Sequence, residues 1–267
     1  MKQKLPESQI CVGNLNKKIM KTFRLIRSQP GSAAYNMALD EKIFLRFMED
    51  GIPVFRVYSW KTPSITYGIS QHAEGEINLK QCNLDGLQIA QRITGGGVLF
   101  HGDEITYSLV CSKEDVGEER EAFVSYRQIC AFLMYFYKTL GLNVCFALEA
   151  DDFKSKSLPH RLCSASHEKF DIVIGGRKIG GNAQKRSRQV IFQHGSIPLK
   201  VNWEFVRRYI PALPMNISSQ VTSLAEELES IPDKQILEQK LICALAHVYG
   251  VRFIEEKELL YAETSLA

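Results

Sequence analysis

The sequence predicts an α+β fold with a central mixed, largely antiparallel sheet flanked by helices and a short helical C-terminal appendage. The predicted strands come in clusters rather than in strict alternation with helices, which disfavours a purely parallel sheet. Two long segments, 32–49 and 118–140, have the apolar pattern of helices. With 267 residues, of which 45% are hydrophobic, the chain can bury a sizeable core.

The first predicted elements are a strand, a helix and two further strands. Residues 1–21 are polar and contain several lysines, and we expect them to form a flexible lead-in. Residues 23–28 alternate between apolar and polar side chains and predict a strand. The helix over 32–49 begins at a serine, as many helices do. Strands over 54–60 and 64–68 are separated by a threonine–proline pair.

The middle of the chain combines short strands with one long helix. A strand over 88–93 runs into three glycines, and strands over 98–100 and 105–111 follow. The helix over 118–140 ends at a glycine that is suited to a C-cap. Residues 142–147 predict the next strand.

The remaining chain changes from strands to helices. Residues 150–170 are polar and irregular. In 171–181, two consecutive glycines lie between short strands, which is a strong hairpin signal. A strand is predicted over 190–199, and helices are predicted over 221–228 and 233–250.

Charge, cysteine content and hydropathy exclude several classes of protein. The formal net charge of +3 is too small to indicate a nucleic-acid partner. The seven cysteines are odd in number and include no CxxC pair, so they favour a reducing compartment over a disulfide framework. The amino terminus has no apolar signal core, and the longest apolar run, 129–137, is shorter than a membrane span. We therefore expect a cytoplasmic protein without nucleic-acid or membrane partners.

Three consecutive glycines in the stretch QRITGGGVLFHGDEITYSLV (91–110) need an explanation, because glycine weakens strands. The stretch is neither a P-loop nor a GxGxxG motif. Without a Cβ atom, Gly95, Gly96 and Gly97 would let a ligand lie directly against the backbone. Arg92 offers a planar fork for a carboxylate or a phosphate. A bulged turn is the alternative interpretation.

A second glycine-rich segment, GGRKIGGNAQKR (175–186), supports a ligand site. Lys178 lies on a short predicted strand, and its neighbours Arg177 and Ile179 would face the opposite side. A lysine beside glycine-rich backbone can contact a carbonyl, a carboxylate or a phosphate. A lone lysine is more often a solvated strand charge, but two such segments in one chain favour a site.

These segments resemble those of a known superfamily. The stretch RITGGGVLFHGDEITYS closely resembles the arginine–Ser/Thr–triple-glycine–His motif of the biotin/lipoate protein ligases. The stretch GRKIGGNAQ, followed by QHGSI, resembles their lysine motif and the next strand, and AAYNMALDE resembles their first helix. The resemblance runs from about Phe23 to Val251. It implies an α+β fold, a tunnel for an octanoyl or lipoyl chain, and a lipoyl-domain lysine as the acceptor.

The resemblance also implies the site and the division of the chain. We expect a lead-in over 1–21, an acyl-transfer or ligase catalytic domain over 22–200, and a helical C-terminal extension of the same domain over 201–267. No metal ligands are implied for the transferase route. The expected binding residues are Arg92, Thr94, Gly95, Gly96, Gly97, His101, Gly180, Gly181, Asn182 and Ala183.

Two chemistries compete within the superfamily, and the resemblance favours transfer through a cysteine. Cys163 lies 15 residues before Lys178, the position and spacing of the nucleophile in cysteine-dependent octanoyltransferases and lipoyl amidotransferases. A nearby cation lowers the pKa of a thiol, so Lys178 would favour the thiolate and stabilise the oxyanion. This route needs no cofactor. Acyl carrier protein is a candidate donor, and the acceptors would be E2 subunits or the glycine cleavage H protein.

Three alternatives stay open at the level of the sequence. A lipoate–protein ligase would use ATP and magnesium, with Arg92 and Lys178 contacting the adenylate phosphate and the acyl carbonyl. A non-catalytic acyl- or carrier-binding protein would keep the fold without turnover. Zinc binding is the third, because the spacing of His160, Cys163 and His167 fits zinc ligands, although no fourth ligand is obvious.

Overall fold

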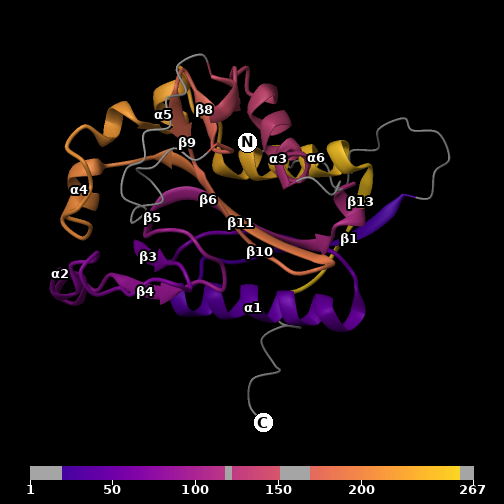
Figure 1. Ribbon diagram of the computed structural model, residues 1–267, viewed down its shortest axis with the longest axis horizontal. Helices are drawn as coiled ribbons and strands as arrows, with labels where there is room; N and C mark the ends of the chain where they lie inside the picture. Colours follow the sequence, from indigo (N-terminus) through magenta and orange to yellow (C-terminus); the bar gives the residue numbers. More distant parts are fainter. Residues whose placement is uncertain (1–19, 118–121, 151–168, 259–267) are drawn as a thin grey trace, which may run out of the picture.

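The architecture is a mixed sheet between two layers of helices (Figure 1). A computed structural model of the chain describes residues 20–117, 122–150 and 169–258. Residues 1–19 of the expected lead-in therefore lie outside the described residues. The first strand already begins at Lys21.

The central sheet has six strands and is largely antiparallel. In spatial order they are β10 (Gly181–Arg186), β11 (Val190–Lys200), β6 (Asp103–Ser112), β2 (Val54–Tyr58), β1 (Lys21–Arg27) and β13 (Val251–Glu255). From β10 to β2 the neighbours pair antiparallel, whereas β1 pairs parallel with both β2 and β13. The predicted α+β fold with a mixed, largely antiparallel sheet is confirmed.

Two smaller sheets lie beside the central one. The first contains β4 (Gln88–Gln91), β3 (Ser64–Tyr67) and β5 (Leu99–His101), and the second contains β12 (Val221–Thr222), β9 (Arg177–Ile179), β8 (Ile172–Ile174) and β7 (Cys145–Phe146). β8 and β9 form the predicted hairpin. Its turn residues Gly175 and Gly176 have φ angles of 54° and 77°. A two-residue hairpin turn favours positive φ at both positions, which explains the glycine pair.

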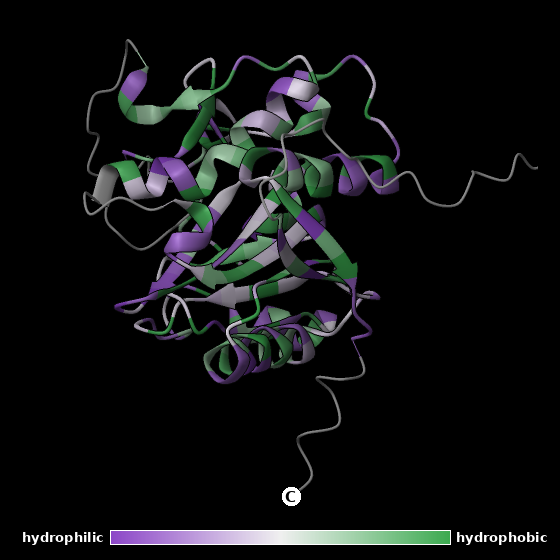
Figure 2. Cartoon of the chain, turned by 90° about the vertical axis from the view of Figure 1, so that its right-hand side faces the viewer, coloured by the Kyte–Doolittle hydropathy of each residue, from purple (hydrophilic) through white to green (hydrophobic). Residues whose placement is uncertain are grey.

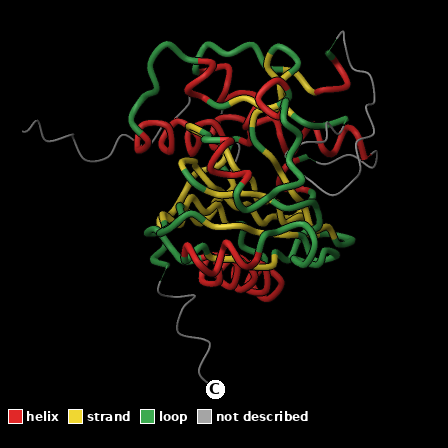
Figure 3. Tube along the Cα trace, turned by 90° about the vertical axis from the view of Figure 1, so that its left-hand side faces the viewer, coloured by secondary structure: helices red, strands yellow, loops and turns green. Residues whose placement is uncertain are grey.

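Helices cover both faces of the central sheet. The longer ones are α1 (Ala33–Asp50), α3 (Ala122–Thr139) and α6 (Lys234–Tyr249), and the shorter ones are α2 (Leu79–Asp85), α4 (Trp203–Arg207) and α5 (Leu224–Glu227). Single 3-10 turns are formed by Glu114–Val116, Ala147–Glu149 and Ile217–Ser219. α1 lies along one face, while α3 and α6 pack together on the other, and Figure 3 shows these layers from the side. Within the described ranges, no helix has the length and hydropathy needed to cross a membrane.

Successive residues of each strand face opposite sides of the sheet, as β6 illustrates. Ile105, Tyr107 and Leu109 lie in the larger core, which the sheet forms with α3 and α6. Between them, Ser108 donates a hydrogen bond to Asp40 on α1. Figure 2 shows hydrophobic residues along the strands between the helical layers. Polar residues of the other face therefore gather on the α1 side of the sheet.

The C-terminal segment contains more than the expected helices. α5 and α6 occur where helices are predicted, and α6 contributes to the larger core. The chain then continues into β13, which pairs Val251 with Lys21 at the edge of the sheet. The helical appendage predicted from the sequence does not include this strand, because local periodicity carries no information on pairing between distant segments. The segment thus completes the central sheet.

Candidate functional site

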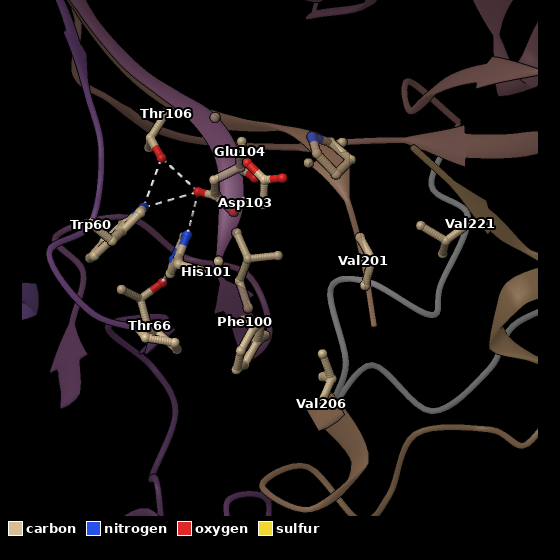
Figure 4. A pocket seen from close by; sticks show the side chains of 18 of the residues that line it. Trp60, Thr66, Phe100, His101, Asp103, Glu104, Thr106, Val201, Val206 and Val221 are labelled. Atoms are coloured by element: carbon tan, nitrogen blue, oxygen red, sulfur yellow. Dashed lines mark hydrogen bonds and ion pairs between the residues drawn. The ribbon is translucent and has the colours of Figure 1, made fainter. Parts of the chain in front are cut away.

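A cavity of about 340 Å³ lies where the central sheet meets β5, β9 and α4. Figure 4 shows its two sides. Trp60, His101 and Glu104 form a hydrogen-bonded polar group on one side, and Val201 and Val206 stand on the other. The apolar wall is lined by Phe100, Val201, Trp203, Phe205, Val206, Ile210 and Val221. Such a cavity suits a ligand with a polar head and an apolar chain.

Both glycine-rich motifs reach this cavity, but not with all of the expected residues. The lining residues among those expected are Arg92, His101, Lys178, Gly180, Gly181, Asn182 and Ala183. Thr94 and Gly95–Gly97 are not among the residues that line it. Cys163, together with His160 and His167, lies outside the described residues. Lys178 therefore lies at the cavity, whereas the role of Cys163 as the nucleophile stays a prediction.

The glycine triplet packs against protein groups. A Cβ atom on Gly68 would lie 2.2 Å from the carbonyl oxygen of Gly96, so the two backbones need glycine to approach this closely. Arg92 donates from Nη2 to the carbonyl oxygens of Gly95 (3.1 Å) and Gly97 (2.8 Å). Arg92 thus supports the backbone of the triplet by hydrogen bonds. A direct contact between the triplet and an acyl chain stays a prediction.

A chain of buried hydrogen bonds connects Arg92 to Glu104. Arg92 Nη1 donates to Thr66 Oγ1 (2.9 Å), and this hydroxyl lies 2.7 Å from His101 Nε2. His101 Nδ1 lies 2.8 Å from Glu104 Oε1. Trp60 stacks on the His101 ring at 4.0 Å between ring centroids and donates from Nε1 to Glu104 (3.0 Å). With both ring nitrogens engaged, His101 is suited to positioning the cavity wall rather than to general base catalysis.

Glu104 is held as a carboxylate within this group. Burial alone would raise its pKa, but the charge of His101 and the hydrogen bonds from His101 and Thr106 outweigh burial and lower the pKa below the ordinary 4.5. The sequence pattern HxxE includes Glu104 without marking it as a site residue, and nothing local marks Trp60. Their roles arise from contacts between β6, β5 and the segment after β2.

The Glu104→Gln variant should have a flatter acid limb in its stability profile than the parent protein. A depressed folded-state pKa means that the carboxylate contributes stability that is fully present above its unfolded pKa and is lost as the pH falls through the folded value. The parent should therefore lose stability below about pH 5 more steeply than the variant. Urea unfolding of both proteins between about pH 7 and pH 3 measures this difference. Parallel profiles would contradict the assignment.

A second carboxylate–imidazole–threonine chain lies beside the first. Thr94 Oγ1 is 2.7 Å from His194 Nε2, and His194 Nδ1 is 3.4 Å from Asp40 Oδ2. Burial, together with the charges of Arg92 and His101, lowers the pKa of His194 below the ordinary 6.5 although Asp40 raises it, so the neutral imidazole is favoured. Thr94, which directly precedes the triplet, is thus connected through His194 to Asp40 on α1. Thr94 does not line the cavity, and its expected role in binding stays a prediction.

Asp40 itself belongs to a buried ion pair. Its Oδ1 atom lies 2.8 Å from Arg56 Nη1, and both side chains are at most 1% exposed. Tyr58 and Ser108 also donate to this carboxylate. Burial would raise the Asp40 pKa, but hydrogen bonding to His194 and the charge of Arg56 lower it overall. The pair connects α1 to the centre of the sheet directly behind His194.

Lys178 is the cation of the cavity wall formed by β9 and β10. It is 4% exposed, and its Nζ lies 2.9 Å from Asp171 Oδ2. Arg177 and Ile179 face the other side, as predicted: Arg177 pairs with glutamates of α5, and Ile179 lies in the larger core. Nothing in the sequence marks Asp171 as its partner beyond the position of an acid directly before a predicted strand. A buried ammonium held in this way can face a carbonyl oxygen or a thiolate.

Comparison with known proteins relates this chain to lipoate metabolism. Residues 32–246 match the family model of the lipoyl protein ligase A/B catalytic domain. Octanoyltransferase LipM of Bacillus cereus is 36% identical over 181 residues, which span 66% of this chain and 65% of that protein. Octanoyltransferase LipM of Kyrpidia tusciae is 34% identical over 69% of each protein. That of Clostridioides difficile is 28% identical over 88% of this chain and 90% of the relative.

Solved structures share the fold. Lipoate-protein ligase A bound with ATP superposes with a TM-score of 0.74 at 22% identity, over 90% of this chain and 92% of that one. The bi-partite lipoate protein ligase of Thermoplasma acidophilum, studied with its E2 lipoyl domain, gives a TM-score of 0.70 at 20% identity over 91% of each chain. At these identities the likeness concerns the fold alone.

Proposed function

The chain belongs to the lipoyl protein ligase A/B catalytic-domain family, and on this premise we propose that it attaches an octanoyl or lipoyl group to the lipoyl-domain lysine of 2-oxoacid dehydrogenase or glycine cleavage proteins. The observation that carries the proposal is a cavity whose lining combines the buried ammonium of Lys178 with an apolar wall. Its size is within the range of small-ligand sites. An acyl chain on the apolar wall would place its carbonyl near the polar residues.

We propose that the transfer proceeds through a thioester on Cys163. The Cys163 thiolate attacks the thioester carbonyl of the donor, a new carbon–sulfur bond forms, the donor's own carbon–sulfur bond breaks, and the donor sulfur takes up the proton that Cys163 had released. The amine of the acceptor lysine then attacks this carbonyl, an amide bond forms, the bond to Cys163 breaks, and the departing sulfur takes up the proton that the amine nitrogen loses. In both steps the carbonyl oxygen gains negative charge, and Lys178 would stabilise it.

The relatives favour this route over a ligase. They are octanoyltransferases, and a transferase takes an already activated acyl group, so it needs neither ATP nor magnesium. The ATP-bound neighbour keeps the ligase as the second candidate. For the transferase route we propose acyl carrier protein as the donor, E2 subunits or the glycine cleavage H protein as acceptors, and the cytoplasm as the compartment.

Intact-mass spectrometry after mixing with octanoyl–acyl carrier protein, without ATP, tests the proposal. We expect an octanoyl adduct on the parent protein and none on Cys163→Ala. Cys243→Ala is the matched control, because this thiol lies on α6 and does not line the cavity, and it should keep the adduct.

Other outcomes distinguish the alternatives. Modification of a lipoyl domain that appears only with ATP and free lipoate would make the protein a ligase and Cys163 a bystander. If no acyl group reaches a lipoyl domain under either condition, the protein binds acyl groups or carriers without turnover.

A further inference from the structure

A chain of side-chain hydrogen bonds runs through the larger core and ends at the cavity. Cys130 on α3 donates from Sγ to Gln193 Oε1 (3.7 Å), and Gln193 Nε2 donates to the Tyr107 hydroxyl (2.7 Å). Tyr107 in turn donates to Asn182 Oδ1 (2.7 Å). Cys130, Gln193 and Tyr107 are fully buried, whereas Asn182 lines the cavity. Such a chain is unexpected in a core of aromatic and aliphatic residues.

All hydrogen bonds of this chain are donated in one direction, from Cys130 towards Asn182. Burial raises the pKa of the Cys130 thiol to about 12, so it stays protonated and can donate. Gln193 accepts from it with the amide oxygen, and its amide N–H groups are left to donate to Tyr107. Tyr107 then uses its single phenolic proton to donate a hydrogen bond to the amide oxygen of Asn182. The Nδ2 amide group of Asn182 is therefore turned away from Tyr107.

A glycine on the neighbouring strand permits this arrangement. Gly195 on β11 pairs with Asn182 on β10. A Cβ atom at Gly195 would lie 2.2 Å from Asn182 Oδ1 and 2.8 Å from the Tyr107 hydroxyl. Any larger residue would separate the two side chains. The glycine of the QHGSI segment is thus required for the contact that orients Asn182.

The oriented amide lies on the same wall as Lys178. Gly180 and Gly181 stand between the two residues and also line the cavity. Within the described part of the chain, no group accepts a hydrogen bond from Asn182 Nδ2. Asp171 lies 2.9 Å from the Lys178 ammonium and offsets part of its charge. A neutral, fixed donor is therefore available in the same cavity as a cation that is already paired.

We propose that Asn182 donates a hydrogen bond from Nδ2 to the carbonyl oxygen of the acyl group, and that Tyr107 is a positioning residue for Asn182. This inference rests on the proposed acyl transfer. In each tetrahedral intermediate the carbonyl oxygen becomes an oxyanion, and the hydrogen bond from Asn182 strengthens without transfer of its proton. A donor fixed before the reaction stabilises the intermediate more than the bound substrate, so it raises kcat.

Kinetics of octanoyl transfer to a lipoyl domain provide the first test. Asn182→Asp keeps the shape and the acceptor for Tyr107 but loses the donor, and we expect kcat to fall about 100-fold while KM changes little. Tyr107→Phe leaves the amide free to rotate, so its kcat should fall by a smaller factor. Lys185→Ala, on the same strand but outside the cavity lining, should keep the parent kcat. An unchanged kcat in Asn182→Asp would overturn the inference.

The infrared carbonyl band of bound [1-¹³C]octanamide provides a test without turnover. A hydrogen bond to the carbonyl lowers its stretching frequency, so the band should lie lower in the parent protein than in Asn182→Asp and Tyr107→Phe. Equal frequencies would overturn the inference even if the parent transfers octanoyl groups. A shifted band in a parent protein that transfers nothing would support the hydrogen bond and refute the proposed function. A purely structural role of Tyr107 would lower the melting temperature of Tyr107→Phe without moving the band.

Discussion

Replacing Lys178 with methionine should lower the rate of acyl transfer by about 1,000-fold or more. The ammonium is buried on the cavity wall that also contains Gly180 and Gly181 of the lysine motif. Methionine fills the same space but removes the charge that faces the developing oxyanion. The loss should appear in kcat and in kcat/KM alike, because the interaction is made mainly in the transition state. Single-turnover transfer from octanoyl–carrier protein to a lipoyl domain measures it.

The neighbouring cation on the same strand is the matched control. Arg177 faces away from the cavity and pairs with Glu226 and Glu227. Arg177→Met should keep the parent rate and change the free energy of unfolding by at most about 1 kcal/mol, as for exposed ion pairs. Because Lys178→Met leaves Asp171 without this partner, thermal unfolding of that variant must be compared as well. A rate within tenfold of the parent, in a folded Lys178→Met protein, would refute the assigned role.

Much of the fold could be predicted from the sequence because its signals are local. The helix over 32–49 begins at Ser32, whose side chain accepts a hydrogen bond from the Tyr35 amide, and it ends at Gly51 in the left-handed conformation. The hairpin at Gly175 and Gly176 is also fixed by its turn. β13 was missed because its pairing with β1 joins the two ends of the described chain. α2 was missed because seven residues with one buried side chain give no periodic signal.

Some residues of the site could also be predicted from the sequence, and others could not. The glycine-rich backbone around Lys178 and the resemblance that includes Asn182 predict these two residues for the site, and both line the cavity. Trp60 and Asp171 were not predicted, because their roles depend on contacts across different elements. Arg92 also lines the cavity, and its hydrogen bonds to Thr66 and to carbonyls of the glycine triplet could not be read from the motif because they depend on the folded backbone.

The sequence does contain one signal for the buried ion pair behind the site. Asn36 and Asp40 are four residues apart on the inner face of α1, where apolar residues are expected. The structure explains both, because Asn36 accepts from Arg56 Nη2 (2.8 Å) and Asp40 pairs with Nη1 (2.8 Å). Arg56 also donates to Ser28 (2.7 Å). Polar residues on an apolar helix face therefore indicated a buried charge on the sheet.

Replacing Asp40 of the Asp40–Arg56 ion pair should lower the free energy of unfolding more than replacing Glu104, Arg177 or Lys178. Asp40→Ala leaves the fully buried guanidinium of Arg56 without its counter-charge, and we expect a loss of about 3–5 kcal/mol in the free energy of unfolding. Urea unfolding at neutral pH, with the m-value checked, measures this loss. Glu255→Ala removes the partner of Arg27 from a pair in which the acid is 71% exposed, and it should cost at most about 1 kcal/mol.

A double-mutant cycle separates the ion pair from simple loss of packing. If the cost of Asp40→Ala comes from an unpaired buried charge, then Arg56→Met should recover part of it, and the double variant should lose less than the sum of the single ones. Additive losses, or a loss below about 1 kcal/mol for Asp40→Ala, would contradict this account. His194 also lies against Asp40, so the recovered double variant should still show impaired acyl transfer. Recovery of stability without recovery of activity would locate the role of Asp40 in positioning His194 and the residue before the glycine triplet.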